Sequence, residues 1–152
     1  MATIAHPTAG ELAQRQPASS ARAVLERAVD AAPSHIPPPR GWLRRLFARG
    51  RSARALIERY RLWPEIEYAY QRITSELGPA RVEISAEDEF GYAFVAVDCY
   101  VDPGENDEHL DLGETLTREL IERLGKKRFA RLLVVIHGDY GTEGDHVDEL
   151  RP

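Results

Sequence analysis

Five consecutive aliphatic residues at positions 132–136 (Leu-Leu-Val-Val-Ile) constrain the fold of this chain more than any other feature. A continuous apolar run of this length is typical of a strand that is buried on both faces. It follows a predicted helix over residues 112–124, in which leucines recur every four residues, and which ends at Gly125. The sequence therefore predicts a crossover helix followed by a strand at residues 129–137, and this strand is expected to pair parallel to an earlier one.

Residues 64–101 are expected to supply the remaining elements of one small domain. Apolar side chains recur at helical spacing from Pro64 to Leu77, and Gly78-Pro79 is a strong helix stop. Residues 80–85 alternate between polar and apolar, residues 86–91 are expected to form a polar hairpin loop, and residues 92–101 are rich in aromatic and β-branched types. The predicted fold class is α+β. It is a two-layer sandwich in the order helix-strand-strand-helix-strand, with both helices on one side of a three-stranded mixed sheet.

The two long strands raise a question about the edge of the sheet. Residues 92–101 are apolar on alternating positions of both faces, so both faces are expected to be at least partly covered. Only one of three strands can be central, so a long apolar strand is left with unpaired amides. We therefore expect pairing with a protein partner or with a second copy of the chain, as a homo-oligomer.

Composition shifts divide the chain into four segments. Residues 1–40 form a Pro- and Ala-rich leader that is expected to be flexible, with a helix over 21–30 only if something covers it. Residues 41–63 form an Arg-rich amphipathic helical segment, 64–140 the α+β domain, and 141–152 an acidic tail. The first 63 residues carry 11 Arg against 4 acidic residues, whereas residues 64–152 carry 9 basic and 21 acidic residues. A basic arm thus precedes an acidic body.

The strongest candidate for partner binding lies in the basic arm. Its apolar side chains fall on one helical face and its arginines fall around the rest; the candidate residues are Trp42, Leu43, Arg44, Arg45, Leu46, Phe47 and Arg49. Docking on the protein's own acidic domain is favoured, followed by a protein partner and then by a membrane surface through residues 41–49. Nucleic acid is disfavoured, because a body with a net charge of −12 repels phosphate.

Catalytic chemistry has only weak support in the sequence. His137, Asp139 and His146 have donor atoms that suit a divalent metal, but no recognised metal motif contains them, and a solvated acidic tail is favoured. Cys99 lies within an apolar strand, where a thiol is usually inert packing. Asp98 interrupts the same strand and is expected to face water near its end. No catalytic residue and no cofactor is predicted.

Composition excludes several classes of protein. A single cysteine cannot form an internal disulfide or a Cys-rich zinc site. No apolar run approaches the roughly 20 residues of a membrane span, and residues 1–10 lack the pattern of a secretory signal, so a cytoplasmic location is expected. The sequence favours a non-catalytic adaptor or regulatory domain that binds protein. Two alternatives stay open: a small metal-dependent hydrolase centred on His137 and Asp139, and a leader that is an export or targeting signal.

Overall fold

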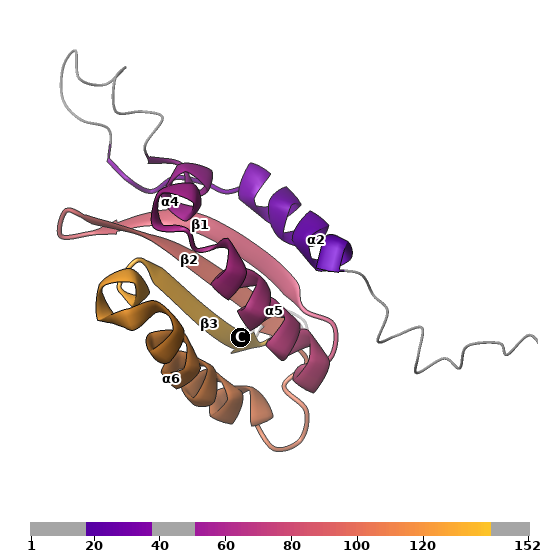
Figure 1. Cartoon of the computed structure of the whole chain (residues 1–152). Helices are drawn as coiled ribbons and strands as arrows, with labels where there is room; N and C mark the ends of the chain where they lie inside the picture. Colours follow the sequence, from indigo (N-terminus) through magenta and orange to yellow (C-terminus); the bar gives the residue numbers. More distant parts are fainter. Residues whose placement is uncertain (1–17, 38–50, 141–152) are drawn as a thin grey trace, which may run out of the picture.

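A computed structural model describes residues 18–37 and 51–140. Within these ranges the chain forms α2 (Ala18–Asp30), α4 (Ala53–Tyr60), α5 (Trp63–Leu77), β1 (Arg81–Glu89), β2 (Tyr92–Val101), α6 (Glu108–Phe129) and β3 (Leu132–Gly138). The strand order is β1-β2-β3, with β2 antiparallel to β1 and parallel to β3 (Figure 1). The predicted α+β order and the mixed three-stranded sheet are confirmed.

Local sequence signals determine where the helices begin and end. Ser52 precedes α4, and its Oγ accepts a hydrogen bond of 3.1 Å from the amide of Ala55, as an N-cap does. Pro64 lies in the first turn of α5, where a missing N–H costs nothing. Gly78 ends α5 with a φ of 86°, and Gly125 interrupts α6 with a φ of 72°, a conformation that glycine adopts without strain.

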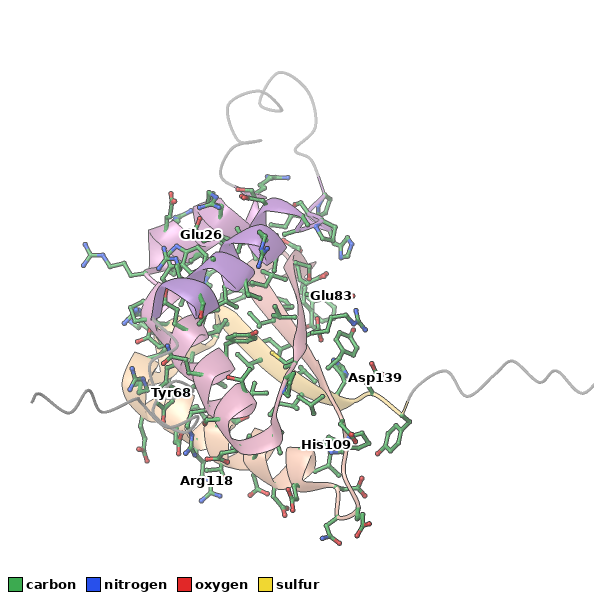
Figure 2. All side chains as sticks on the ribbon, turned by 90° about the vertical axis from the view of Figure 1, so that its right-hand side faces the viewer. Glu26, Tyr68, Glu83, His109, Arg118 and Asp139 are labelled. Atoms are coloured by element: carbon green, nitrogen blue, oxygen red, sulfur yellow. The ribbon has the colours of Figure 1, made fainter. Side chains whose placement is uncertain are left out.

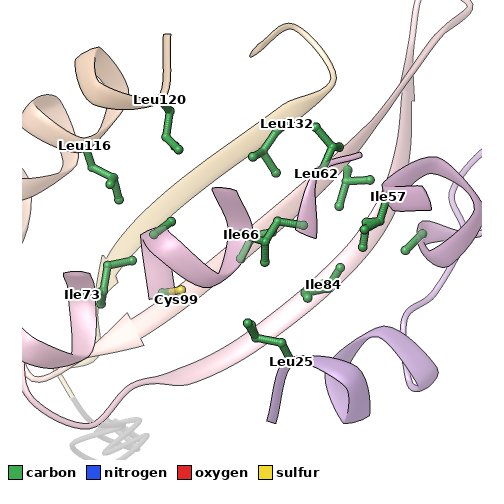
Figure 3. Close-up of a cluster of buried hydrophobic side chains, with 14 of the residues drawn as sticks. Leu25, Ile57, Leu62, Ile66, Ile73, Ile84, Cys99, Leu116, Leu120 and Leu132 are labelled. Atoms are coloured by element: carbon green, nitrogen blue, oxygen red, sulfur yellow. The ribbon is translucent and has the colours of Figure 1, made fainter. Parts of the chain in front are cut away.

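One hydrophobic core lies between the four described helices and one face of the sheet (Figure 3). The helices contribute Leu25, Ile57, Ile66, Ile73, Leu116 and Leu120, and all of these are almost fully buried. The sheet contributes side chains at alternating positions of its strands, namely Ile84, Ala86, Val95, Val97, Cys99, Val101, Leu132 and Ile136. The expectation that the odd-numbered positions of β2 face the core is therefore confirmed.

The structure places α2 in this core rather than in a leader. Leu25 and Val29 are buried against the rest of the domain, and the guanidinium of Arg22 lies 3.7 Å from the ring centre of Trp63. The sequence predicts this helix only if other residues pack against its apolar stripe. In the structure, α4, α5 and β1 do so. Residues 18–37 and α4 thus belong to the folded domain, whereas the predicted leader placed the former outside it. Long-range packing decides this, because the apolar stripe of α2 is thin by itself.

The hairpin between β1 and β2 is tighter than the sequence indicates. Residues 86–89, which we expected in a loop, continue β1 and pair with Tyr92, Ala93, Phe94 and Val95 of β2. Only Phe90 and Gly91 form the turn. Three consecutive acidic residues, Glu87, Asp88 and Glu89, made this stretch look like a loop, but Glu87 and Glu89 lie on the face of β1 opposite to the buried Ala86, and Asp88 bonds to the turn. A strand that is exposed on one face accepts Glu and Asp at every second position.

Candidate interaction surface

No described helix covers the second face of the sheet, which we call the open face. Figure 2 shows Glu83 of β1 on the side of the sheet opposite to Glu26 and Tyr68, which belong to helices. The register places Ala96 beside Leu133 on this face, Asp98 beside Val135, and Tyr100 beside His137. None of these six residues belongs to the core cluster or to the side chains packed against it. Both faces of β2 were expected to be at least partly covered. On the open face Ala96 is buried and Phe94, Asp98 and Tyr100 are partly buried, although no described helix lies over them.

The centre of the open face is apolar. Ala96 of β2 lies beside Leu133 of β3; Phe94 precedes Ala96 by two positions and Val135 follows Leu133 by two positions on the same face. Leu133 is 46% exposed, while Phe94 and Val135 are partly exposed. Single exposed apolar residues are ordinary on a protein surface, but neighbouring ones on a flat sheet form a patch of the kind that mediates contacts.

The tip of the β1–β2 hairpin carries a strained and exposed aromatic residue. Phe90 is fully exposed (100%) and has a φ of 53°, followed by Gly91 with a φ of 80°. Two positive φ angles are typical of a type I′ turn, in which Asn, Asp or Gly is usual at the first position. Phenylalanine in this conformation costs about 1–2 kcal/mol. The side chain of Asp88 stabilises the turn, because its Oδ1 accepts a 2.9 Å bond from the Gly91 amide.

Two arginines hold the tyrosines of the open face in place. The guanidinium of Arg131 lies 3.7 Å from the ring centre of Tyr92 and donates a 2.8 Å hydrogen bond to the carbonyl of Ala93. The guanidinium of Arg81 lies 4.1 Å from the ring centre of Tyr100 and also pairs with Glu83. Cation–π contacts of this kind order large aromatic side chains at a surface that no helix covers.

A carboxylate and an imidazole form the polar end of the open face. His137 Nε2 lies 2.7 Å from Asp98 Oδ1, and the imidazole stacks on Tyr100 with ring centres 4.7 Å apart. Asp98 also lies directly opposite Glu83 in the β1–β2 register. Like charges in that position destabilise a sheet. Each of the two carboxylates has its own partner here, His137 for Asp98 and Arg81 for Glu83. The sequence singled out Asp98 and His137, but it did not bring them together, because 38 positions separate them along the chain.

The two outer edges of the sheet differ in their hydrogen bonding. At β1, the amide of His35 donates to the carbonyl of Ala86 at 2.8 Å, and the amide of Ala86 donates to the carbonyl of Pro33 at 3.0 Å. At β3, the bonds from Val95 N to Arg131 O and from Asp139 N to Val101 O show that odd-numbered residues face β2. The amides of even-numbered residues therefore point outward. Within residues 18–37 and 51–140, the outward amide of Val134 has no hydrogen-bond acceptor.

Most of the other residues that the sequence singled out lie outside the described ranges. They are His146 and the seven partner-binding candidates of the basic arm, Trp42, Leu43, Arg44, Arg45, Leu46, Phe47 and Arg49. His137 pairs with Asp98 rather than with Asp139, whose amide continues the bonding between β2 and β3. In the described part of the chain, no three His, Cys, Asp or Glu side chains gather in an arrangement that could hold a metal ion. The described helices also include none with the length and apolarity of a membrane span.

Cys99 lies on the helix-covered face and is fully buried. Burial raises the pKa of its thiol to about 12, and the neighbouring carboxylate of Asp98 adds to the shift. The thiol is therefore protonated at neutral pH and is not a nucleophile there. This matches its expected role as packing.

Sequence reasoning missed Phe90 and the open face as a whole. An aromatic residue directly before glycine inside a polar stretch was the available signal for the tip. For the open face, the apolar even-numbered positions of β2 were visible, but they do not reveal which face the helices cover. Comparison of the chain with protein-family models, with curated proteins and with solved structures finds no match.

Proposed function

We propose that this chain is a non-catalytic interaction protein that binds another protein on the open face of its sheet. The observation that carries the proposal is the patch formed by Phe94, Leu133 and Val135 on a face that no described helix covers, with Tyr92 toward the hairpin and the fully exposed Phe90 at the hairpin tip. Aromatic residues are enriched in the cores of protein interfaces, and a small number of them usually dominate the binding energy.

The strain at Phe90 supports a role in binding. A turn with two positive φ angles would be more stable with Asn or Gly at this position. The phenylalanine contributes nothing to the core, because its side chain is fully exposed. A residue that costs stability and packs against nothing in the described chain is well placed to insert into a partner.

The partner that best fits this surface is a protein segment with apolar side chains flanked by arginine or lysine. Glu83, Glu87 and Glu89 of β1 lie on one side of the patch, and the body of the chain carries an excess of acidic residues. Basic flanks would meet these carboxylates without being desolvated, which favours orientation and association rate more than affinity.

The arginine-rich segment is proposed as a second contact. The Oγ of Ser34 donates to the carbonyl of Arg51 at 2.9 Å, and the guanidinium of Arg51 donates to the carbonyl of Pro37. These bonds bring Pro37 and Arg51, the described residues on either side of positions 38–50, together near the β1 edge. A basic segment at that point would contact an acidic region of the same partner, or of the domain itself.

The decisive experiment is affinity capture from the native cell with the full chain and two matched variants. Leu133→Asp places a carboxylate at the centre of the patch, whereas Ala23→Asp places the same group on the exposed side of α2. We expect a captured protein, identified by mass spectrometry, to be lost with Leu133→Asp and retained with Ala23→Asp. Circular dichroism confirms that both variants are folded. Equal capture by both variants contradicts a role for the open face.

A further inference from the structure

The edge strand β3 and the neighbouring side of α6 form a second surface, distinct from the open face. We propose that two copies of this chain associate through it about a two-fold axis. In this dimer β3 pairs antiparallel with β3 of the second copy, and α6 packs antiparallel against α6. The two three-stranded sheets become one sheet of six strands, with both open faces on the same side.

The first support is the edge itself. β3 lies at the end of the strand order, and its outward amides, of which Val134 is the central one, find no acceptor within the described residues. The strand sequence LLVVIHG contains no acidic residue, no lysine or arginine, and no proline. Monomeric proteins usually protect such an edge with charges, prolines or bulges.

The second support is the side of α6 that faces away from α5. Glu119 accepts hydrogen bonds from Tyr68 and Arg72, so this position of α6 faces α5. Helical periodicity places residues 110, 113, 117 and 121 on the opposite side, where the helix borders β3. These are Leu, Gly, Thr and Ile, and Leu110 is 62% exposed. These four residues are uncharged, and the nearest charged side chain, Glu114 at the border of the stripe, forms an i,i+4 ion pair with Arg118.

Absence of charge identifies a second copy as the occupant. Near a two-fold axis each residue lies close to its own counterpart, so any charge there would meet a like charge. Both β3 and the uncharged stripe of α6 avoid this repulsion. The opposite edge of the sheet does not, since β1 carries Arg81, Glu83, Glu87, Asp88 and Glu89.

The ends of α6 add electrostatic complementarity. Its first turn contains Glu108 and Asp111, and its last turn contains Lys126, Lys127 and Arg128. An antiparallel arrangement brings the acidic start of one α6 toward the basic end of the other, and the two helix dipoles oppose each other favourably. A parallel arrangement would bring like charges together. The chemistry of the helix thus selects the same two-fold geometry as the pairing of the strands.

The test is the molar mass of the full chain in solution, measured by light scattering over a range of concentrations. The wild type is expected at twice the 17.1 kDa of one chain. Thr117→Arg puts a charge at the middle of the stripe and should halve the molar mass. Glu122→Arg puts the same side chain on an exposed position outside the stripe and should leave the dimer intact.

Val134→Pro tests the strand pairing. The outward amide makes no bond to β2, so proline removes no hydrogen bond within one chain but blocks pairing between chains. A folded Val134→Pro protein should be monomeric. If this variant does not fold, Thr117→Cys replaces it. Two copies of that cysteine lie close to the axis and should form a disulfide under oxidation, whereas the buried Cys99 does not react and Glu122→Cys forms no disulfide.

A wild type that stays at 17.1 kDa at the highest soluble concentration overturns the inference, as does a Thr117→Arg variant that remains dimeric. A monomeric wild type that captures a different protein through this surface also overturns it, because the occupant is then not a second copy. These results are independent of the open face. If the protein is strictly monomeric and Leu133→Asp abolishes capture of a partner, the dimer proposal is wrong but the proposed function is supported.

Discussion

The two edges of the sheet differ in how their exposed backbone hydrogen-bonding groups are protected. The β1 edge is paired over a short length with residues 33–35 and is lined by charged side chains. The β3 edge is apolar and has no partner within the described residues. Within residues 18–37 and 51–140, backbone pairing and charged side chains protect the β1 edge but not the β3 edge. The proposed dimer assigns the β3 edge to a contact with a second copy, because natural proteins usually protect such edges.

The protected edge depends on α2, and the largest effect is expected there. Leu25 is fully buried, and α2 packs against β1 just before the segment that pairs with Ala86. Leu25→Ala should lower the free energy of unfolding by about 2–5 kcal/mol, because it leaves a cavity in the core. Urea denaturation measures this, with the partly exposed Val24→Ala as control. A loss below that of the control would show that α2 is only loosely attached.

The pH dependence of stability at Cys99 tests how well the helices exclude water from the covered face of the sheet. Below pH 9.0, the ordinary pKa of the thiol, both folded and unfolded states keep the proton. Above it only the unfolded state releases the proton, until the pH reaches the folded pKa of about 12. Stability should therefore fall by up to about 1.4 kcal/mol per pH unit in this window.

Denaturation between pH 8 and pH 10 measures that slope, and Cys99→Ala isolates it from other groups. Burial also raises the pKa of Tyr70, so tyrosines contribute at the upper end of the range. The variant should lose stability less steeply with pH than the wild type. Equal slopes would mean that the thiol is accessible to water, and that the helix-covered face is open as well.

Phe90 tests whether the hairpin tip serves binding at the expense of stability. Phe90→Asn should raise the free energy of unfolding by about 1 kcal/mol, because asparagine tolerates a positive φ better. The same change should weaken capture of a partner through the open face. Thermal denaturation and affinity capture measure the two effects. A variant that is less stable than the wild type would show that the phenylalanine packs against something.

The smallest effect is expected at the ion pair on the protected edge. His35 Nδ1 lies 2.7 Å from Glu87 Oε1, and the histidine side chain is mostly exposed. His35→Ala should cost less than about 1 kcal/mol, because solvent screens exposed pairs and the backbone bonds to Ala86 remain. Urea denaturation checks this. Self-association of the variant through β1 would show that the side chain, and not the backbone pairing, protects the edge.

The sequence by itself determined the local structure and the order of the elements. Ser52 and Gly78 mark helix ends through backbone chemistry that operates over a few residues. Gly125, where the sequence predicted a helix end, instead kinks α6, which continues to Phe129. The leucine repeat before an aliphatic strand was enough to predict the crossover and the parallel pair. The even and odd positions of β2 were also assigned to opposite faces correctly, because the side chains of a strand alternate.

Only the tertiary structure decided which surfaces are covered. The sequence could not show that α2 joins the core, that the even-numbered face of β2 lacks a described helix, or that Asp98 meets His137. Periodicity reports which residues share a face, since neighbouring residues impose it. What lies against that face depends on segments far apart in the chain, whose contacts form only when the whole domain packs.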